Sequence, residues 1–203
     1  MGKIKLTKGE LKKERDALRR YERYLPILQL KKQQLQIEIL RQAALLEEKR
    51  RHESETIKNI ETWGGLLTDR AVNIRQWLKL EKINIGSKNI AGTDLPIFEG
   101  VEFGFAEYDL FSTPLWVDTA VELLRALVSL REEIGILEKG IYILRHELRI
   151  TTQRVNLFEK VKIPEAEEAI RVIKIYLGDQ MSNAVGRSKI AKKKIEEAEE
   201  VVV

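Results

Sequence analysis

Apolar side chains recur in alternating steps of four and three residues through the second half of this 203-residue chain. Ten of the twelve positions in the series are apolar, and the series reads Leu123, Leu127, Leu130, Ile134, Leu137, Ile141, Leu144, Leu148, Thr151, Val155, Phe158, Lys162. A mean period of 3.5 residues keeps one face of a helix apolar when that helix supercoils left-handed around a partner. The series therefore predicts a long helix that pairs with another helix.

The first part of the chain is expected to supply that partner helix. Thr7 and Glu10 fit a capping box, in which the Thr7 hydroxyl accepts from a free backbone N–H and Glu10 reaches back. No convincing stop follows before Trp63, Gly64 and Gly65, and eight of twelve sampled heptad positions before it are apolar. Pro26 removes one hydrogen bond of the helix and is expected to bend it.

Between the two helical segments the composition changes. Residues 61 to 116 hold 8 of the 13 aromatic residues and 6 of the 12 glycines. We therefore expect an N-terminal coiled-coil helix at 1–60, a small Gly- and aromatic-rich head at 61–114, and a C-terminal coiled-coil helix with a tail at 115–203, forming one rod-like unit. Alternation of Val101, Phe103 and Phe105 with smaller or polar residues predicts a strand.

Ile83, Asn84 and Ile85 are the expected partner strand, with turn residues Gly86, Gly92, Asp94 and Pro96 between the two. The predicted fold class is mainly α, a long antiparallel two-helix coiled coil with a small inserted head that holds this possible β-hairpin. If residue 60 lies near residue 116, paired residue numbers sum to about 176, and about 34 C-terminal residues project past the start of the first helix. Pro164 should interrupt the second helix, and the charged tail should fray.

The predicted coiled-coil seam takes its residues from both helices. These are Leu11, Leu18, Leu25, Leu28, Leu35, Leu123, Leu130, Ile134, Leu137, Ile141, Leu144, Leu148 and Val155.

The residues that usually carry enzyme chemistry are scarce. The chain has no cysteine, no P-loop pattern and no H-E-x-x-H pattern, and no run of 18 apolar residues. Neither His52 nor His146 has a suitable carboxylate cluster beside it, so both are interpreted as solvated helix-face residues. We therefore predict no catalytic, cofactor-binding or metal-binding residue, no cofactor, and no enzymatic activity of the chain itself.

Basic residues gather at the two chain ends. Residues 1 to 25 carry nine Lys or Arg against four acids, whereas residues 61 to 114 carry five bases against eight acids. In the antiparallel arrangement the two basic ends lie toward one end of the coiled coil. Solubility alone, a protein contact and nucleic-acid binding are all compatible with such an end. The candidate contact residues are Lys3, Lys5, Lys8, Lys12, Arg187, Lys189, Lys192 and Lys193.

Four segments resemble one known family in their order along the chain. Residues 4–8 (IKLTK), 24–32 (YLPILQLKK), 89–96 (NIAGTDLP) and 155–164 (VNLFEKVKIP) resemble corresponding segments of the D subunit of the V-type (A-type) ATPase or ATP synthase. The likeness does not extend to residues 97–116, and it is weaker in the tail after Gly178.

This resemblance implies a central-stalk rotor shaft. It implies that the termini enter a catalytic hexamer of A and B subunits. The other end would bind the F subunit and a collar subunit on the membrane ring, with Gly92, Leu95, Pro96 and Phe103 as candidate head contacts. It implies a cytoplasmic, peripheral position at the inner face of the plasma membrane. It also implies that the subunit couples ATP hydrolysis or synthesis to H⁺ or Na⁺ movement. No direct contact with nucleotide or nucleic acid and no lipid-spanning contact is expected. The alternative from the residues alone is a stand-alone coiled-coil adaptor with a basic nucleic-acid-binding end.

Overall fold

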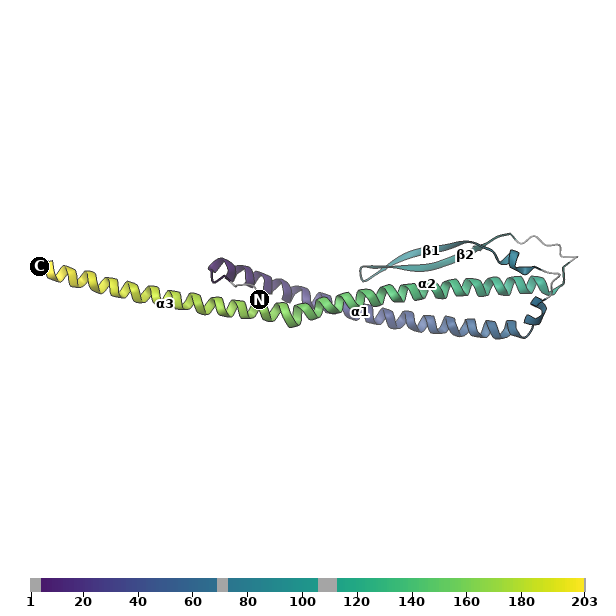
Figure 1. Ribbon diagram of the computed structural model, residues 1–203, viewed down its shortest axis with the longest axis horizontal. Helices are drawn as coiled ribbons and strands as arrows, with labels where there is room; N and C mark the ends of the chain where they lie inside the picture. The colour runs from purple at the N-terminus through teal and green to yellow at the C-terminus, as the bar shows by residue number, and fades with distance from the viewer. Residues whose placement is uncertain (1–4, 69–72, 106–112, 203) are drawn as a thin grey trace. The chain divides into compact units, whose positions relative to one another are not determined.

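The computed structural model describes residues 5–68, 73–105 and 113–202. Along the chain, a β-hairpin lies between long helices (Figure 1). The elements are α1 (Lys8–Glu61), the 3-10 helices η1 (Gly64–Thr68) and η2 (Ile74–Leu78), the strands β1 (Leu80–Ile90) and β2 (Thr93–Phe103), α2 (Trp116–Leu157), the π-helical turn η3 (Phe158–Lys162) and α3 (Ile163–Val202). The predicted fold class, an antiparallel two-helix coiled coil with a small inserted hairpin, is confirmed.

The start of α1 confirms the predicted role of Thr7 but not that of Glu10. The backbone N–H of Glu10 donates to Thr7 Oγ1 at 3.2 Å, and the N–H of Leu11 donates to the Thr7 carbonyl at 3.0 Å. Thr7 therefore satisfies a donor that the first turn of a helix leaves free. The prediction that Glu10 reaches back to the cap is wrong, because its carboxylate pairs with Lys13 at 3.2 Å and the Thr7 N–H donates to the Lys5 carbonyl at 2.9 Å. The helix then continues through Pro26 to Glu61.

The chain divides into two compact units, which we call the hairpin unit (residues 31–151) and the terminal unit (residues 1–30 with 152–203). In the hairpin unit α1 and α2 run antiparallel and are joined by ion pairs. The predicted register placed Lys31 opposite about residue 145 and Lys49 opposite about residue 127. Lys31 pairs with Glu147 at 2.7 Å and Lys49 with Glu133 at 2.8 Å, so the predicted register is shifted, most strongly near the hairpin base.

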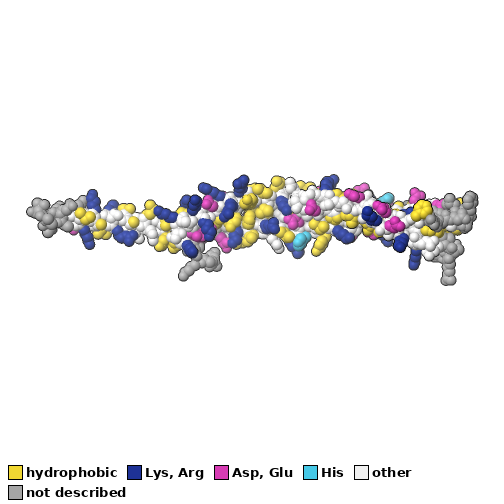
Figure 2. All heavy atoms as spheres, turned by 90° about the horizontal axis from the view of Figure 1, so that it is seen from above, with side chains coloured by type: hydrophobic (Ala, Val, Ile, Leu, Met, Phe, Trp, Pro, Cys, Tyr) yellow, Lys and Arg dark blue, Asp and Glu magenta, His cyan; other side chains and the backbone are white. Residues whose placement is uncertain are grey.

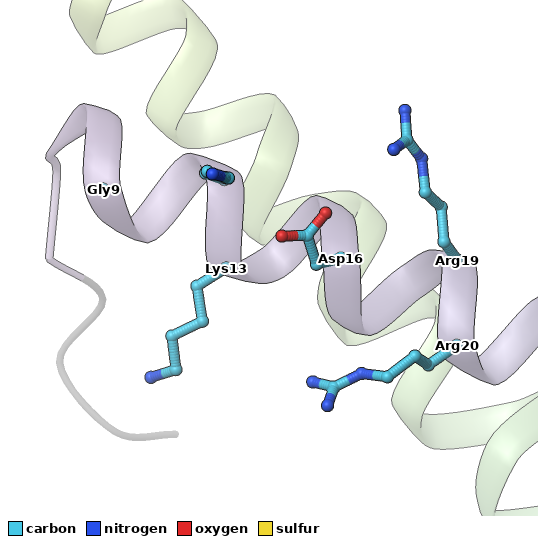
Figure 3. A pocket seen from close by; sticks show the side chains of 6 residues that line it. Gly9, Lys13, Asp16, Arg19 and Arg20 are labelled. Atoms are coloured by element: carbon cyan, nitrogen blue, oxygen red, sulfur yellow. The ribbon is translucent and has the colours of Figure 1, made fainter.

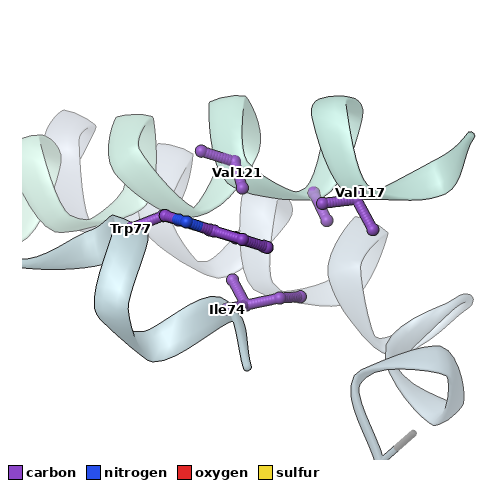
Figure 4. Close-up of a cluster of buried hydrophobic side chains, with 5 residues drawn as sticks. Ile74, Trp77, Val117 and Val121 are labelled. Atoms are coloured by element: carbon purple, nitrogen blue, oxygen red, sulfur yellow. The ribbon is translucent and has the colours of Figure 1, made fainter. Parts of the chain in front are cut away.

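The first turns of α2 explain this shift. Val117, Ala120 and Val121 are buried against Ile74 and Trp77 of η2 (Figure 4). Half-buried Trp63, Leu67, Leu78, Trp116 and Leu124 surround this cluster. The start of α2 therefore packs on the 3-10 segments, and its pairing with α1 begins later along the chain than a direct helix reversal would require.

The predicted hairpin is present, with longer strands than expected. Ile83 pairs with Val101, and the two strands are connected through Ala91 and Gly92, whose φ angles are 51° and 75°. Positive φ at both central residues suits the two-residue turn that matches strand twist. The turn prediction is wrong for Gly86, Asp94 and Pro96, which lie within strands, and Phe105 follows β2. The pairing of ten residues on each strand outweighs the turn preference of these three residues.

The turn end of the hairpin packs on both long helices. Leu95 of β2 is buried with Leu35 of α1 and Leu144 of α2, and Ile90 and Ala91 pack against the same cluster. Leu35 and Leu144 have no exposed surface. Because a two-stranded sheet alone is marginally stable, this cluster supplies the apolar burial that holds the hairpin.

In the terminal unit the helix continues past the predicted break. The N–H of Ile163 donates to the carbonyl of Phe158 across η3, and α3 runs from Ile163 to Val202. The interruption expected at Pro164 takes the form of the π-helical turn η3 just before it, and the chain stays helical on both sides. α3 passes through Gly178 and Gly186 without a break, and the expected fraying of the charged tail stays a prediction.

Candidate functional site

The two histidines lie apart from acidic clusters. His52 of α1 and His146 of α2 are both exposed, on the solvent side of their helices. Over residues 5–68, 73–105 and 113–202, no group of three or more His, Asp or Glu side chains is placed to hold a metal ion. In the same ranges, none of the helices has the length and apolar character needed to span a bilayer.

The predicted seam residues lie toward the interior of each unit. Leu35, Leu130, Ile134, Ile141, Leu144 and Val155 are buried, and Leu11, Leu18, Leu25, Leu28, Leu123, Leu137 and Leu148 are half-buried. Thr151 of the heptad series is buried too. Ala17 and Ile136 are also buried and were not among the predicted positions. Small and β-branched residues beside a Leu-rich series give a weak sequence signal, which explains why they were missed.

Ion pairs connect α1 and α2 across the seam in the hairpin unit. Besides the two pairs that set the register, Arg50 contacts Glu138 at 2.6 Å and Arg131 contacts Glu53 at 2.8 Å. Each partly exposed pair contributes only about 0–1 kcal/mol. Their placement on both helices nevertheless opposes sliding of one helix along the other.

Glu38 is the one acidic side chain among those identified as buried in the described ranges. It accepts a hydrogen bond from Gln42 Nε2 at 2.8 Å, and Arg41 Nη1 lies 3.9 Å from its other oxygen. It lines a hollow with Lys88, Leu95 and Glu133, between the hairpin and the two helices. Sequence analysis gave no signal for this residue, because its depth depends on the hairpin that covers it.

The basic residues of the N-terminal segment lie on open helix surface. Lys5, Lys8 and Lys12 are exposed, and Lys3 lies outside the described residues. A shallow hollow on the first turns of α1 is lined by Gly9, Lys12, Lys13, Asp16, Arg19 and Arg20, with the long basic side chains directed outward (Figure 3). The surface therefore presents several cations around a single carboxylate.

The basic residues of the tail lie on α3 where no other helix covers it. Ile173 is buried and Leu177 half-buried, and the described side chains after Leu177 are exposed apart from the half-buried Gly186. Figure 1 shows α3 continuing past the start of α1 in the same unit. The exposed candidates Arg187, Lys189, Lys192 and Lys193 lie here, and Lys193 pairs with Glu197 of its own helix at 3.5 Å.

Figure 2 shows basic and acidic side chains mixed with apolar ones over the face in view. Exposed apolar side chains occur on α1 of the hairpin unit, where Ile37 and Leu40 are 66% and 72% exposed. They lie on the side of α1 away from buried Leu35. Such exposed aliphatic neighbours on a charged helix are candidates for a contact with another protein.

The four predicted head contacts differ in accessibility. Gly92 is exposed at the hairpin turn and Pro96 is half-buried opposite Ser87, whereas Leu95 is buried in the cluster with Leu35 and Leu144. Phe103 is half-buried, and the guanidinium of Arg125 lies 5.2 Å from its ring centre. Leu95 and Phe103 therefore contribute to packing within the chain, and Gly92 and Pro96 remain open to a partner.

Arg125 was not predicted from the sequence and holds the base of the hairpin. Its side chain donates to the main-chain carbonyls of Trp77 and Gly104, at 2.7 and 2.6 Å through Nη2. It lies between Leu123 and Leu127 in the heptad series, so it resembles an ordinary charged flank in the sequence.

Hydrogen bonds shift the pKa values of charged groups in the terminal unit. Arg171 donates two hydrogen bonds to the carboxylate of Glu168, at 2.6 and 2.8 Å, and these bonds lower the pKa of Glu168. The ammonium of Lys162 donates to Glu165 at 3.0 Å, which raises the pKa of Lys162. Both shifts stabilise surface charge and do not prepare a group for proton transfer at neutral pH.

Comparisons of the sequence with a family model and with known proteins agree on one family. The family of ATP synthase D subunits matches residues 10–193. The D subunit of a V-type ATP synthase from Borreliella burgdorferi is 45% identical over 192 residues, which is 95% of each chain. Proteins of the same name from Chlamydia abortus and Chlamydia felis are 35% and 34% identical, each covering 97% of this chain and 96% of its own.

Proposed function

This chain belongs to the family of ATP synthase D subunits, and from that membership we propose that it is the central-stalk rotor subunit of a V-type ATP synthase. In this role it couples ATP hydrolysis or synthesis in a hexamer of A and B subunits to movement of H⁺ or Na⁺ across the membrane. The chain itself carries no reaction, and its contribution is mechanical.

The architecture of the hairpin unit supports a mechanical role. A shaft must resist twisting, and a coiled coil places its packing along one continuous seam. Buried Leu35, Ile141 and Leu144 form part of that seam, and the four ion pairs between α1 and α2 add connections on its flanks. The mixed charge of the outer surface suits a part that must move past its neighbours without adhering to them.

The uncovered part of α3 is the proposed contact with the hexamer. It extends past the last buried residue, Ile173, and carries the exposed Arg187, Lys189 and Lys193. Together with Lys5, Lys8 and Lys12 of the other chain end, these cations would interact with acidic groups of the A and B subunits.

The hairpin unit is the proposed contact with the remaining stalk. The F subunit and the collar subunit on the membrane ring are its proposed partners, with exposed Gly92 and half-buried Pro96 as accessible candidates. In this proposal the chain is a peripheral subunit at the cytoplasmic face of the plasma membrane.

Family membership over residues 10–193 is the observation that carries the proposal. The test is co-expression of the tagged chain with the A, B and F subunits of the same organism, followed by affinity purification. The chain is expected to recover all three in a complex that hydrolyses ATP. If the chain recovers none of the three subunits, the proposal is refuted. Steeply salt-dependent binding of the isolated chain to DNA would favour the adaptor function instead.

A further inference from the structure

A π-helical turn, η3, lies between α2 and α3. Over η3 the hydrogen-bond spacing widens to five residues, as the bond from Ile163 to Phe158 shows. Pro164 follows at once, has no N–H to donate, and its ring would collide with the carbonyl four residues earlier in a regular helix. The wider turn accommodates both defects of the proline.

The row of buried residues is interrupted at the same place. Val155 and Ala166 are buried, and none of residues 156–165 between them is buried. Lys162 occupies a position of the heptad series there, which puts a charged side chain on the seam. A hollow beside it is lined by Glu14 and Tyr21 of α1 together with Lys160, Pro164 and Glu165.

The two helices meet at this turn through an aromatic contact. Tyr21 of α1 and Phe158 contact each other with ring centres 5.2 Å apart and planes inclined by 48°. In residues 5–30 and 152–177, the ion pairs given by the structure each join residues three apart on one helix, including Lys162 with Glu165. The hairpin unit, by contrast, has four ion pairs between its helices.

A π turn also changes the phase of the helix that follows it. It holds one residue more than an α-turn, and one residue corresponds to about 100° of rotation around a helix. When the turn closes to α geometry, the apolar face of α3, with Ala166, Ile170 and Ile173, must rotate relative to the face of Val155. A change from π to α hydrogen bonding at η3 would therefore change how α3 meets α1.

We propose that residues 158–164, with Tyr21 as the facing contact, are a compliant joint in the coiled coil, where the helix exchanges between π and α hydrogen bonding. The joint lies in the terminal unit, and its use in transmitting torque rests on the proposed rotor function. The local exchange itself is a property of the isolated chain, so it can be tested separately from assembly with other subunits.

The test is amide hydrogen exchange on the full-length chain, with wild type, Pro164→Ala and Pro26→Ala compared. In wild type, amides of residues 158–163 are expected to exchange about tenfold or more faster than those of residues 141–150. Pro164→Ala restores a backbone donor and should slow exchange at 158–163 by about threefold or more. Pro26→Ala makes the same chemical change in α1 and should leave that segment unaltered.

Three results would overturn the joint. Equal protection of residues 158–163 and 141–150 in wild type would show that the hydrogen bonds of the turn open no more readily than those of α2 in the hairpin unit. Unchanged exchange in Pro164→Ala would remove the proline as its cause. Equal slowing in Pro26→Ala would indicate a general stabilisation. Each result concerns the isolated chain, so it leaves the rotor proposal standing, whereas failed co-purification with A, B and F would not affect the joint.

Discussion

The Nη2 atom of Arg125 lies 2.7 Å from the carbonyl oxygen of Trp77, so an arginine of α2 holds the backbone of η2. The same nitrogen donates to the carbonyl of Gly104, just after β2, at 2.6 Å. One side chain thereby ties both ends of the hairpin to the helix. Charge-assisted hydrogen bonds of this kind are stronger than neutral ones, which suggests the first prediction.

Replacing Arg125 with Met should destabilise the hairpin unit. The substitution keeps much of the apolar stem and removes the bonds to Trp77 and Gly104, so we expect a loss of about 1–3 kcal/mol in the free energy of unfolding. Urea denaturation followed by tryptophan fluorescence measures this directly, since Trp77 lies in the affected cluster. Arg149→Met, at an exposed position of the same helix, is the control. Equal stability of the two variants would contradict the role of Arg125.

A charge in the seam should have an effect that depends on depth. Leu144 has no exposed surface, whereas Leu137 is half-buried and lines the hollow beneath the hairpin. Burying an unpaired carboxylate costs several kcal/mol, so Leu144→Asp should lower helicity and melting temperature more than Leu137→Asp. Circular dichroism during heating gives both quantities. If neither variant melts earlier than wild type, the placement of the seam is wrong.

Removing the tail after Gly178 should separate folding from coupling. The described side chains beyond Leu177 are exposed apart from the half-buried Gly186, so the truncated chain should keep the melting temperature of the full chain within a few degrees. In the assembled enzyme, we expect ATP hydrolysis that no longer drives ion uptake into vesicles. Full coupled transport by the truncated chain would refute the proposed contact of α3 with the hexamer.

Polar replacement of Ile37 and Leu40 should weaken assembly without weakening the fold. Both side chains are largely exposed, so Ile37→Ser with Leu40→Ser removes little burial within the chain and should change its stability by about 1 kcal/mol or less. If this face of α1 contacts a partner, the double variant should recover less F subunit or hexamer during purification. Glu47→Ser with Glu48→Ser, at exposed acidic positions of the same helix, provides the matched control. Unchanged recovery of all partners would exclude this face as a contact.

The pair Glu168 and Arg171 predicts a small acid dependence of stability. Hydrogen bonds from Arg171 lower the pKa of Glu168 in the folded chain, so the folded state binds that proton less readily than the unfolded state. The stabilisation is present above the ordinary pKa of a glutamate and disappears as pH falls through the lowered value. Side-chain carboxyl NMR should show the low pKa of Glu168 and its return toward the ordinary value in Arg171→Gln. An unchanged pKa in that variant would contradict the assignment.

Local patterns account for what the sequence predicted correctly. The cap at Thr7 and the heptad series from Leu123 each depend on residues close together in the chain, so their consequences follow from helix geometry alone. The strand partners Ile83 and Val101 followed from alternation of side chains. The register near the hairpin base was missed, because the start of α2 packs on Trp77 and Ile74 instead of α1.

The sequence by itself determined two long amphipathic helices, a short hairpin between them and a basic surplus at both chain ends. The tertiary structure decided how Leu95 joins Leu35 and Leu144, how Arg125 reaches the carbonyls of Trp77 and Gly104, and how the helix passes Pro164 through a π turn. Periodicity specifies which face of a helix is apolar. The partner of that face, and the depth of any polar group beside it, depend on residues tens to more than a hundred positions away, which are brought together only when the chain folds.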